Sequence, residues 1–251
     1  MSEHSKWSTI KRKKAANDAK RGAVFTRLAR EIAMVSREGG GDSEINFSLR
    51  LAMDKAKAAN MPKENIERAI KRGTGDDKDG AIIEQIMYEG FAPDGIALMI
   101  DVVTDNRNRT VADLRHVLIR SGGNMADAGA VSWQFRRMSY FHISLAGQDS
   151  DEIFEISVDA GADDVMIGAD DIEIIAPVEV FKKVSDALSS NEIRPDEAGL
   201  RYLPNSEIQL PSDESLRVMR IIEEVEDLED VQQVYSNLEV TEEAVALLES
   251  A

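Results

Sequence analysis

The fold class follows from one stretch, Asp171-Ile-Glu-Ile-Ile-Ala-Pro-Val-Glu-Val-Phe-Lys-Lys-Val-Ser-Asp-Ala-Leu188, in which a strand runs directly into a helix. Its first six residues are predicted to form the strand, and Pro177 opens the helix. The apolar residues that follow recur at helical spacing and are Val180, Phe181, Val184 and Leu188. The stretch therefore predicts a strand followed by an amphipathic helix.

The residues on both sides of this stretch repeat the alternation of strands and helices. Phe141, Ile143 and Leu145 alternate with polar residues, which predicts a strand. The other elements expected here are a helix at about residues 150–160 and strands near residues 164–168 and 197–203. Residues 138–203 thus follow a β-α-β-β-α-β order, which is the ferredoxin-like pattern.

A second α/β block is expected upstream. Its elements are strands over Ile82 to Phe91 and Gly95 to Thr104, joined by the turn Ala92-Pro93-Asp94-Gly95, and a helix from about Thr110 to Arg120. Val131, Trp133 and Phe135 alternate, which predicts a further strand and favours a core position for Trp133 over a base-stacking platform. This β-β-α-β order is incomplete as a sheet domain.

The C-terminal part can complete that block. Residues 206–240 are predicted to form a strand, a helix opened by Pro211 and a last strand over Val231 to Val240. We therefore expect a discontinuous α/β domain, 81–137 plus 204–240, with the ferredoxin-like unit 138–203 inserted into it.

The N-terminal part, residues 8–72, is predicted to be helical. Phe25, Leu28, Ile32 and Val35 lie within one sector of a helical wheel, and Lys20, Arg27, Arg30 and Arg37 lie on the other side. The expected helix limits are a stop at Gly39-Gly40-Gly41, a cap at Asp42 or Ser43, a start at Pro62 and a stop at Gly73, with Ile45 in the second apolar stripe. The fold class expected is α+β: a helical bundle (22–75) with a basic arm (1–21), followed by the two α/β domains.

The charge reverses along the chain. Residues 1–72 carry 17 Lys and Arg against 9 Asp and Glu, whereas the remaining residues carry 13 against 38. An acidic protein that gathers its cations in one terminal third is expected to use them on a polyanion.

The arm holds most of the candidate binding residues. Four consecutive cations at 11–14 point to all sides of any helix, and only Glu3 and Asp18 can pair with them. The candidate nucleic-acid contacts of the arm and the next helix are Lys6, Trp7, Lys11, Arg12, Lys13, Lys14, Lys20, Arg21 and Arg27. The alternative interpretation is that the arm is a solvated helix face or a tail without a binding role. Trp7 is expected to stack on a base or to pack on the bundle.

The loop Thr104-Asp-Asn-Arg-Asn-Arg-Thr110 is the second candidate. It follows a strand and precedes a helix, so unpaired N–H groups of the helix start lie beside Arg107 and Arg109 and can bind an anion. The alternative is a capped turn whose arginines pair with nearby acids, because Asp and Asn are good turn residues.

No catalytic residue is predicted. The chain has no cysteine, and its three histidines, His4, His116 and His142, are scattered without a metal-binding spacing. We expect no cofactor and no metal. The chain has no apolar run long enough for a membrane span and no signal-peptide pattern, so a cytoplasmic protein without a membrane partner is expected.

Several stretches resemble the YebC family, whose members are described as probable transcriptional regulatory proteins. The matching stretches are His4-Ser-Lys-Trp7, Asp18-Ala-Lys-Arg21, Ala58-Ala-Asn-Met-Pro-Lys63, Asn65-Ile-Glu-Arg-Ala-Ile-Lys-Arg-Gly73, Tyr88-Glu-Gly90, Thr104-Asp-Asn-Arg-Asn-Arg-Thr110 and Gly122-Gly-Asn124. The resemblance implies a helical domain followed by two α/β domains, one inserted in the other. It also implies nucleic-acid binding, since some members are described as DNA-binding regulators and others, including a mitochondrial translational activator, act on translation.

Two functions are therefore expected ahead of a third. The first is a non-enzymatic, DNA-binding transcriptional regulator. The second is a ribosome-associated translation factor whose basic arm binds ribosomal or transfer RNA, which the charge layout favours. An enzyme is the third, and no site chemistry supports it. The sequence gives neither the target nor the oligomeric state.

Overall fold

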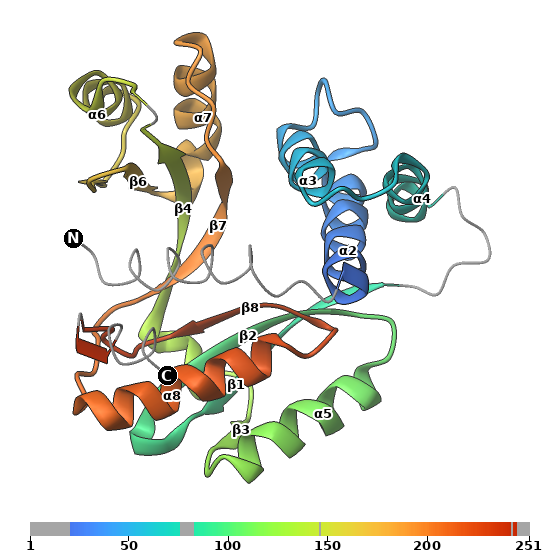
Figure 1. Cartoon of the computed structure of the whole chain (residues 1–251), viewed down its shortest axis with the longest axis vertical. Coiled ribbons are helices and arrows are strands. Elements are labelled where there is room, and N and C mark those ends of the chain that lie inside the picture. The colour runs from blue at the N-terminus through green and yellow to red at the C-terminus, as the bar shows by residue number, and fades with distance from the viewer. Residues whose placement is uncertain (1–20, 76–82, 146, 242, 245–251) are drawn as a thin grey trace.

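Three helices precede two separate four-stranded sheets in the computed structural model, which describes residues 21–75, 83–145, 147–241 and 243–244, with the backbone alone for residues 21–23. Figure 1 shows the helices at the upper right, the first sheet below with two helices beneath it, and the second sheet at the upper left. The chain enters the second sheet at β4 and leaves it at the end of β7. The α+β fold class is confirmed.

The helical bundle consists of α2 (Arg21–Gly39), α3 (Phe47–Ala58) and α4 (Lys63–Thr74). The apolar sector of α2 packs inward as predicted, with Ile32 fully buried against Leu49 and Ile66. Gly73 lies where α4 meets α2, because a Cβ atom there would lie 2.2 Å from the carbonyl oxygen of Ala33. The missing side chain therefore allows the two helices to pack closely.

The first sheet has the order β3-β1-β2-β8, and every pair is antiparallel. Its elements are β1 (Glu84–Phe91), η1 (Pro93–Gly95), β2 (Ala97–Thr104), α5 (Arg107–Arg120), β3 (Asn124–Ala126), α8 (Ser212–Glu226) and β8 (Val231–Ser236). The helices α5 and α8 cover one face through a core that includes Ile100, Leu118 and Met219. Strand β8 returns from the end of the chain to pair with β2.

The second sheet has the antiparallel order β5-β6-β4-β7. Its elements are η2 (Ser132–Gln134), β4 (Phe135–Ser144), α6 (Ser150–Asp159), β5 (Asp164–Ile167), β6 (Asp171–Ala176), η3 (Val178–Val180), α7 (Phe181–Ser190) and β7 (Glu197–Pro204). This is the ferredoxin-like order predicted, with α6 and α7 packed on Phe141 and Ile174. Because β8 joins the first sheet, the second α/β unit is inserted into the first. We propose the domain limits expected above, 138–203 inserted into 81–137 plus 204–240.

Several predicted helix limits were wrong. Asn46, not Asp42 or Ser43, caps α3, since its Oδ1 accepts the Leu49 N–H at 3.0 Å while its Nδ2 donates to the Val35 and Gly40 carbonyls. Ile45 therefore stays outside the helix and is 81% exposed. At α4, Pro62 is the residue before the helix, and the stop is Gly75 in the left-handed conformation.

Two predicted strands and one helix start also differ. The strand expected over Val131 to Phe135 is a loop with a 3-10 turn, and its role in the first sheet is taken by β3. The strand expected after residue 206 is reduced to a single bridge between Ile208 and Leu238. Helix α5 begins at Arg107, three residues earlier than expected, because Asn106 caps it.

None of the described helices combines the length and the apolar character that crossing a bilayer needs.

Candidate nucleic-acid interface

The structure describes the side chains of three of the predicted contact residues, Arg27, Arg107 and Arg109. The predicted contacts Lys6, Trp7, Lys11, Arg12, Lys13, Lys14 and Lys20 lie outside the described residues, and the side chain of Arg21 is not described. The arm therefore stays a prediction.

The loop between β2 and α5 has the strand-to-helix geometry that the sequence predicts. Asn106 caps α5 by accepting the Arg109 N–H at 3.1 Å. Thr104 Oγ1 accepts the Asn106 N–H at 2.9 Å and lies 2.9 Å from the Thr110 hydroxyl oxygen. The two threonines thus close the loop at its base, and residues 105–109 between them are exposed.

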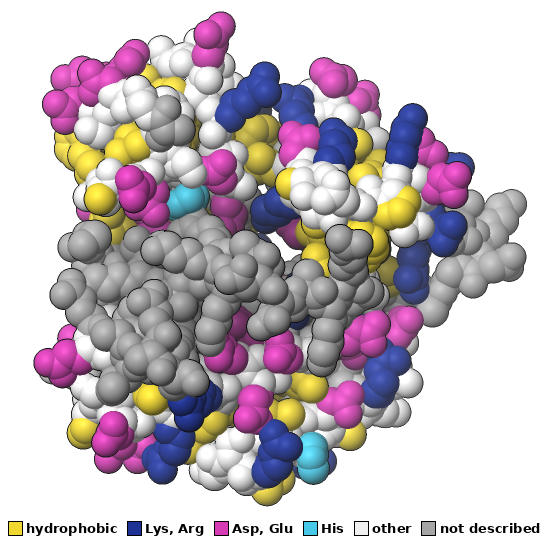
Figure 2. Space-filling view, in the orientation of Figure 1, with side chains coloured by type: hydrophobic (Ala, Val, Ile, Leu, Met, Phe, Trp, Pro, Cys, Tyr) yellow, Lys and Arg dark blue, Asp and Glu magenta, His cyan; other side chains and the backbone are white. Residues whose placement is uncertain are grey.

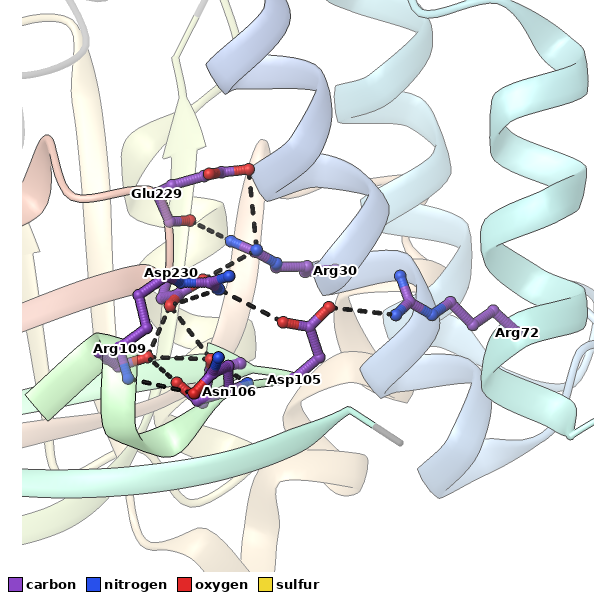
Figure 3. Close-up of polar contacts among 9 residues, drawn as sticks. Arg30, Arg72, Asp105, Asn106, Arg109, Glu229 and Asp230 are labelled. Carbon is purple, nitrogen blue, oxygen red and sulfur yellow. Dashed lines mark hydrogen bonds and ion pairs between the residues drawn. The ribbon is translucent and has the colours of Figure 1, made fainter. Parts of the chain in front are cut away.

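Asp230 is the centre of the polar contacts behind this loop. Figure 3 shows cations from α2 and α5 converging on it. Arg109 donates to both carboxylate oxygens at 2.9 Å, and Arg30 lies 2.8 Å from Oδ1. Thr110 and Thr104 donate to Oδ2 at 2.6 and 3.1 Å. Asp230 is thus a buried carboxylate with four partners.

These contacts keep Asp230 ionised. Burial alone would raise its pKa, but the hydrogen bonds from Thr110 and Arg109 and the positive charge of Arg30 outweigh burial and lower the pKa. The same hydrogen bond, with the charges of Asp230 and Asp105, raises the pKa of Arg109. The carboxylates of Asp230 and Asp105 therefore offset part of the positive charge of Arg109.

The helix α4 meets the same loop from the other side. Arg72 lies 3.7 Å from Asp105, and Figure 3 shows the two side chains facing each other. Arg68, Lys71 and Arg72 share one face of α4, because they are three and four residues apart. We call the five cations that this contact brings to one edge the basic junction: Arg68, Lys71, Arg72, Arg107 and Arg109.

The residues of the basic junction differ in solvent exposure and in ion pairing. Arg107 is 63% exposed and pairs with Glu84 on β1, and Arg109 is 45% exposed. Arg68 and Lys71 are exposed and have no ion pair within the described part of the chain. In Figure 2 the basic side chains gather on the helical bundle, whereas acidic ones dominate the region of α6. Arg68 and Lys71 were not among the predicted contacts, although they lie in the family-like stretch from Asn65 to Gly73.

Arg27 has a structural contact instead. It donates through Nη2 to the carbonyl oxygen of Glu226 at the end of α8. Arg30 and Arg37 make similar contacts to the Glu229 and Ile83 carbonyls. The polar face of α2 therefore docks on the first α/β unit, and a role for Arg27 in nucleic-acid binding stays a prediction.

Trp133 is the clearest difference between sequence and structure. It was expected in the core, but it is 71% exposed. The loop that carries it is held by Glu89, a buried carboxylate that accepts the N–H groups of Gly129, Val131 and Ser132 at 2.7, 2.6 and 3.0 Å. Burial alone would raise the pKa of Glu89, and these three N–H groups lower it.

A cavity of about 700 Å³ lies between α2, α3, both sheets and α7. Its charged side chains are already paired in part, as Lys55 lies 3.1 Å from Glu31 and Arg201 lies 2.6 Å from Glu197. Burial raises the pKa of Asp101 on its wall. The cavity shows that the three parts of the chain meet without filling the space between them.

Two sequence models of one family match the chain. The model described as the TACO1/YebC protein N-terminal domain matches residues 5–76, and the one described as the TACO1/YebC second and third domain matches residues 83–238. A protein of Prosthecochloris aestuarii named probable transcriptional regulatory protein is 45% identical over 253 residues and covers 100% of both chains. A protein of the same name from Geotalea uraniireducens is 44% identical and covers 97% of this chain and 98% of its own.

A solved structure has the same fold. The crystal structure of a conserved hypothetical protein from Aquifex aeolicus matches with a TM-score of 0.80 at 39% sequence identity, covering 90% of this chain and 93% of that one.

Proposed function

Because the chain belongs to the TACO1/YebC family, we propose that it is a non-enzymatic, nucleic-acid-binding regulator of gene expression that acts on DNA to control transcription. The name of its relatives, probable transcriptional regulatory protein, supports the transcriptional part of this proposal. We propose that it acts in the cytoplasm and has no membrane partner.

The observation that carries the proposal is the basic junction. A protein with a formal charge of −17 repels a polyanion over most of its surface, so binding needs a local concentration of cations. The contact between Arg72 and Asp105 brings the cationic face of α4 to the loop that holds Arg107 and Arg109. Such cations bind phosphates and orient the protein, and they carry no sequence information themselves.

The arm extends this surface in the proposal. Its Lys and Arg residues precede α2, and α2 packs against α4, which carries the cationic face. Phosphate contacts from both regions add to the salt dependence of binding, by about 0.9 per phosphate on duplex DNA. The seven cations from Lys6 to Arg21 would then make the larger share of the contacts.

RNA on the ribosome is the second candidate target. One observation favours it: Trp133 is an exposed aromatic side chain, and proteins recognise single-stranded RNA by stacking bases on such side chains. A translation factor of this kind would use the same arm and the same basic junction.

The test is ultraviolet crosslinking in growing cells, followed by sequencing of the recovered DNA and RNA and by sedimentation on a ribosome gradient. Discrete promoter DNA without ribosomal sedimentation is the expected result for a transcriptional regulator. Crosslinks to ribosomal or transfer RNA, with sedimentation lost at high salt, would assign the protein to translation. Recovery of neither nucleic acid above the level of an uncrosslinked control would contradict the proposal.

A further inference from the structure

Trp133 lies at a solvent-exposed position of the fold. It lies in η2, between β3 of the first sheet and β4 of the second, and its side chain is among the exposed large apolar groups of the described residues. Single exposed apolar side chains are common at protein surfaces, so the significance of this one depends on whether the loop and the ring are held in one arrangement.

Three sets of hydrogen bonds fix the loop. The carboxylate of Glu89 accepts three of its N–H groups. The side chain of Asn205, after β7, donates to the Trp133 carbonyl at 3.0 Å, and the Asn205 N–H donates to the Gln134 carbonyl at 2.7 Å. The indole Nε1 of Trp133 donates to the Ala130 carbonyl at 3.0 Å, which orients the ring itself.

The fold does not require an aromatic ring at this position. Glu89 and Asn205 bind the backbone, so the loop would keep its contacts with most side chains at residue 133. The buried neighbours Val131 and Phe135 supply the core packing of this segment. The ring is nevertheless exposed in one orientation, and a ligand that binds a side chain already ordered loses less conformational entropy.

The first charged residue after Trp133 in the sequence is a cation. Arg136 on β4 is exposed, whereas Arg137 points to the opposite face of the strand and lines the cavity described above. An aromatic ring followed by an exposed cation, on a protein that is otherwise acidic, matches a nucleotide, which combines a flat base with a phosphate.

We propose that Trp133 stacks on an unpaired nucleobase of the bound nucleic acid, with Arg136 meeting an adjacent phosphate. This inference rests on the proposed function and adds to it a contact at a second place. Glu89 pairs with Met99, whereas the basic junction lies beyond Thr104, so the two places are about 17 Å apart along β2. The unpaired base comes from single-stranded RNA or from opened DNA, which share this chemistry.

The experiment uses the full chain with Trp7→Phe, because Trp133 is then its one tryptophan. A 20-nucleotide RNA, the DNA of the same sequence and the DNA duplex are titrated at one salt concentration. Trp133 emission reports stacking, and the anisotropy of a labelled strand reports binding. Stacking predicts quenching by a single strand that saturates together with the anisotropy change, and much weaker quenching by the duplex.

The variant Trp133→Ala should weaken single-strand binding about tenfold, in line with the stacking of one base, and duplex binding by less than twofold. Trp133→Phe should keep most of the affinity. The relative strength of RNA and single-stranded DNA identifies the source of the base. Binding with unchanged Trp133 emission and unchanged affinity of Trp133→Ala would overturn this inference and leave the proposed function standing. Absence of binding of the unsubstituted chain to all three probes would overturn both.

Discussion

Arg30 and Asp230 form an ion pair of 2.8 Å that joins the helical bundle to the first α/β unit. Arg30 comes from the middle of α2 and Asp230 from the turn before β8, and their side chains are only 10% and 5% exposed. Arg109 of the candidate binding loop shares the same carboxylate. The docking of the helices and the shape of the loop therefore depend on one buried charge.

Replacing that charge should weaken the whole molecule. In Asp230→Asn the buried Arg30 loses its closest carboxylate, and breaking a buried pair costs about 3–5 kcal/mol of unfolding free energy. Glu229→Gln is the matched control, because Glu229 lies 3.8 Å from Arg30 and is 60% exposed. It should cost below about 1 kcal/mol. Urea unfolding of both variants measures the difference, and equal losses would show that Asp230 has no special role.

Glu89 should stabilise the Trp133 loop in a pH-dependent manner. Its pKa is lowered in the folded protein, so its contribution is fully present above the unfolded pKa of about 4.3 and is lost as the pH falls through the lower folded pKa. In Glu89→Gln that contribution is lost at every pH, at a cost of about 1–3 kcal/mol.

Amide hydrogen exchange at Gly129, Val131 and Ser132 measures this effect directly. Protection should fall in Glu89→Gln and stay unchanged in Asp127→Asn, which alters an exposed carboxylate of the same loop. Protection that is equal in Glu89→Gln and the parent protein would contradict the role given to Glu89.

Gly73→Ala should separate α4 from α2. The new Cβ atom would lie 2.2 Å from a backbone oxygen, which cannot move away as a flexible side chain could. Overpacking of this kind costs about 1–3 kcal/mol, even though alanine favours a helix by about 1 kcal/mol over glycine. Gly199→Ala is the control, because nothing lies within 4 Å of its Cβ position. A thermal midpoint lowered equally in both variants would contradict the close packing inferred at Gly73.

The architecture could be read from the sequence because most elements have strong periodic patterns. The ferredoxin-like order of the inserted unit follows from alternation and helical spacing within short windows. The errors occurred where a distant polar group decides the local structure. Asn46 moves the start of α3 because it binds the end of α2, and Glu89 folds residues 129–132 into a loop from some forty residues earlier in the chain.

In the candidate site, too, the prediction failed where a residue distant in the sequence decides the contact. The loop from Thr104 to Thr110 was predicted as a strand-to-helix turn with two arginines, and its geometry follows. Asp230 offsets part of the positive charge of Arg109. It lies far away in the sequence, and no pattern in the residues around it predicts this contact. Trp133 was assigned to the core because the alternation around it is real for Val131 and Phe135, which are both buried.

The two arginines of the loop should therefore behave differently when replaced. Arg107→Ala removes an exposed cation and should change stability by less than about 1 kcal/mol. If Arg107 contacts a phosphate, the salt slope of duplex DNA binding should fall by about 0.9. Arg109→Ala should also lower stability, by about 1–3 kcal/mol, because Asp230 loses a charged hydrogen-bond donor. An unchanged affinity and an unchanged salt slope in Arg107→Ala would show that the Arg107 side chain forms only the ion pair with Glu84.

Removal of residues 1–20 should reduce nucleic-acid binding more than either loop variant, without lowering stability. The truncation begins the chain at Arg21, where α2 starts, and the core of the helical bundle among the described residues begins at Phe25. It removes six cations, so the salt slope on duplex DNA should fall by up to about 5 if each contacts a phosphate. Replacing Lys11, Arg12, Lys13 and Lys14 by Gln in the full chain separates charge from chain length and should reproduce most of the loss. Binding is measured by anisotropy at one salt concentration and stability by the thermal midpoint. A truncated protein that binds as tightly as the full chain would move the interface away from the arm and onto the basic junction and Trp133.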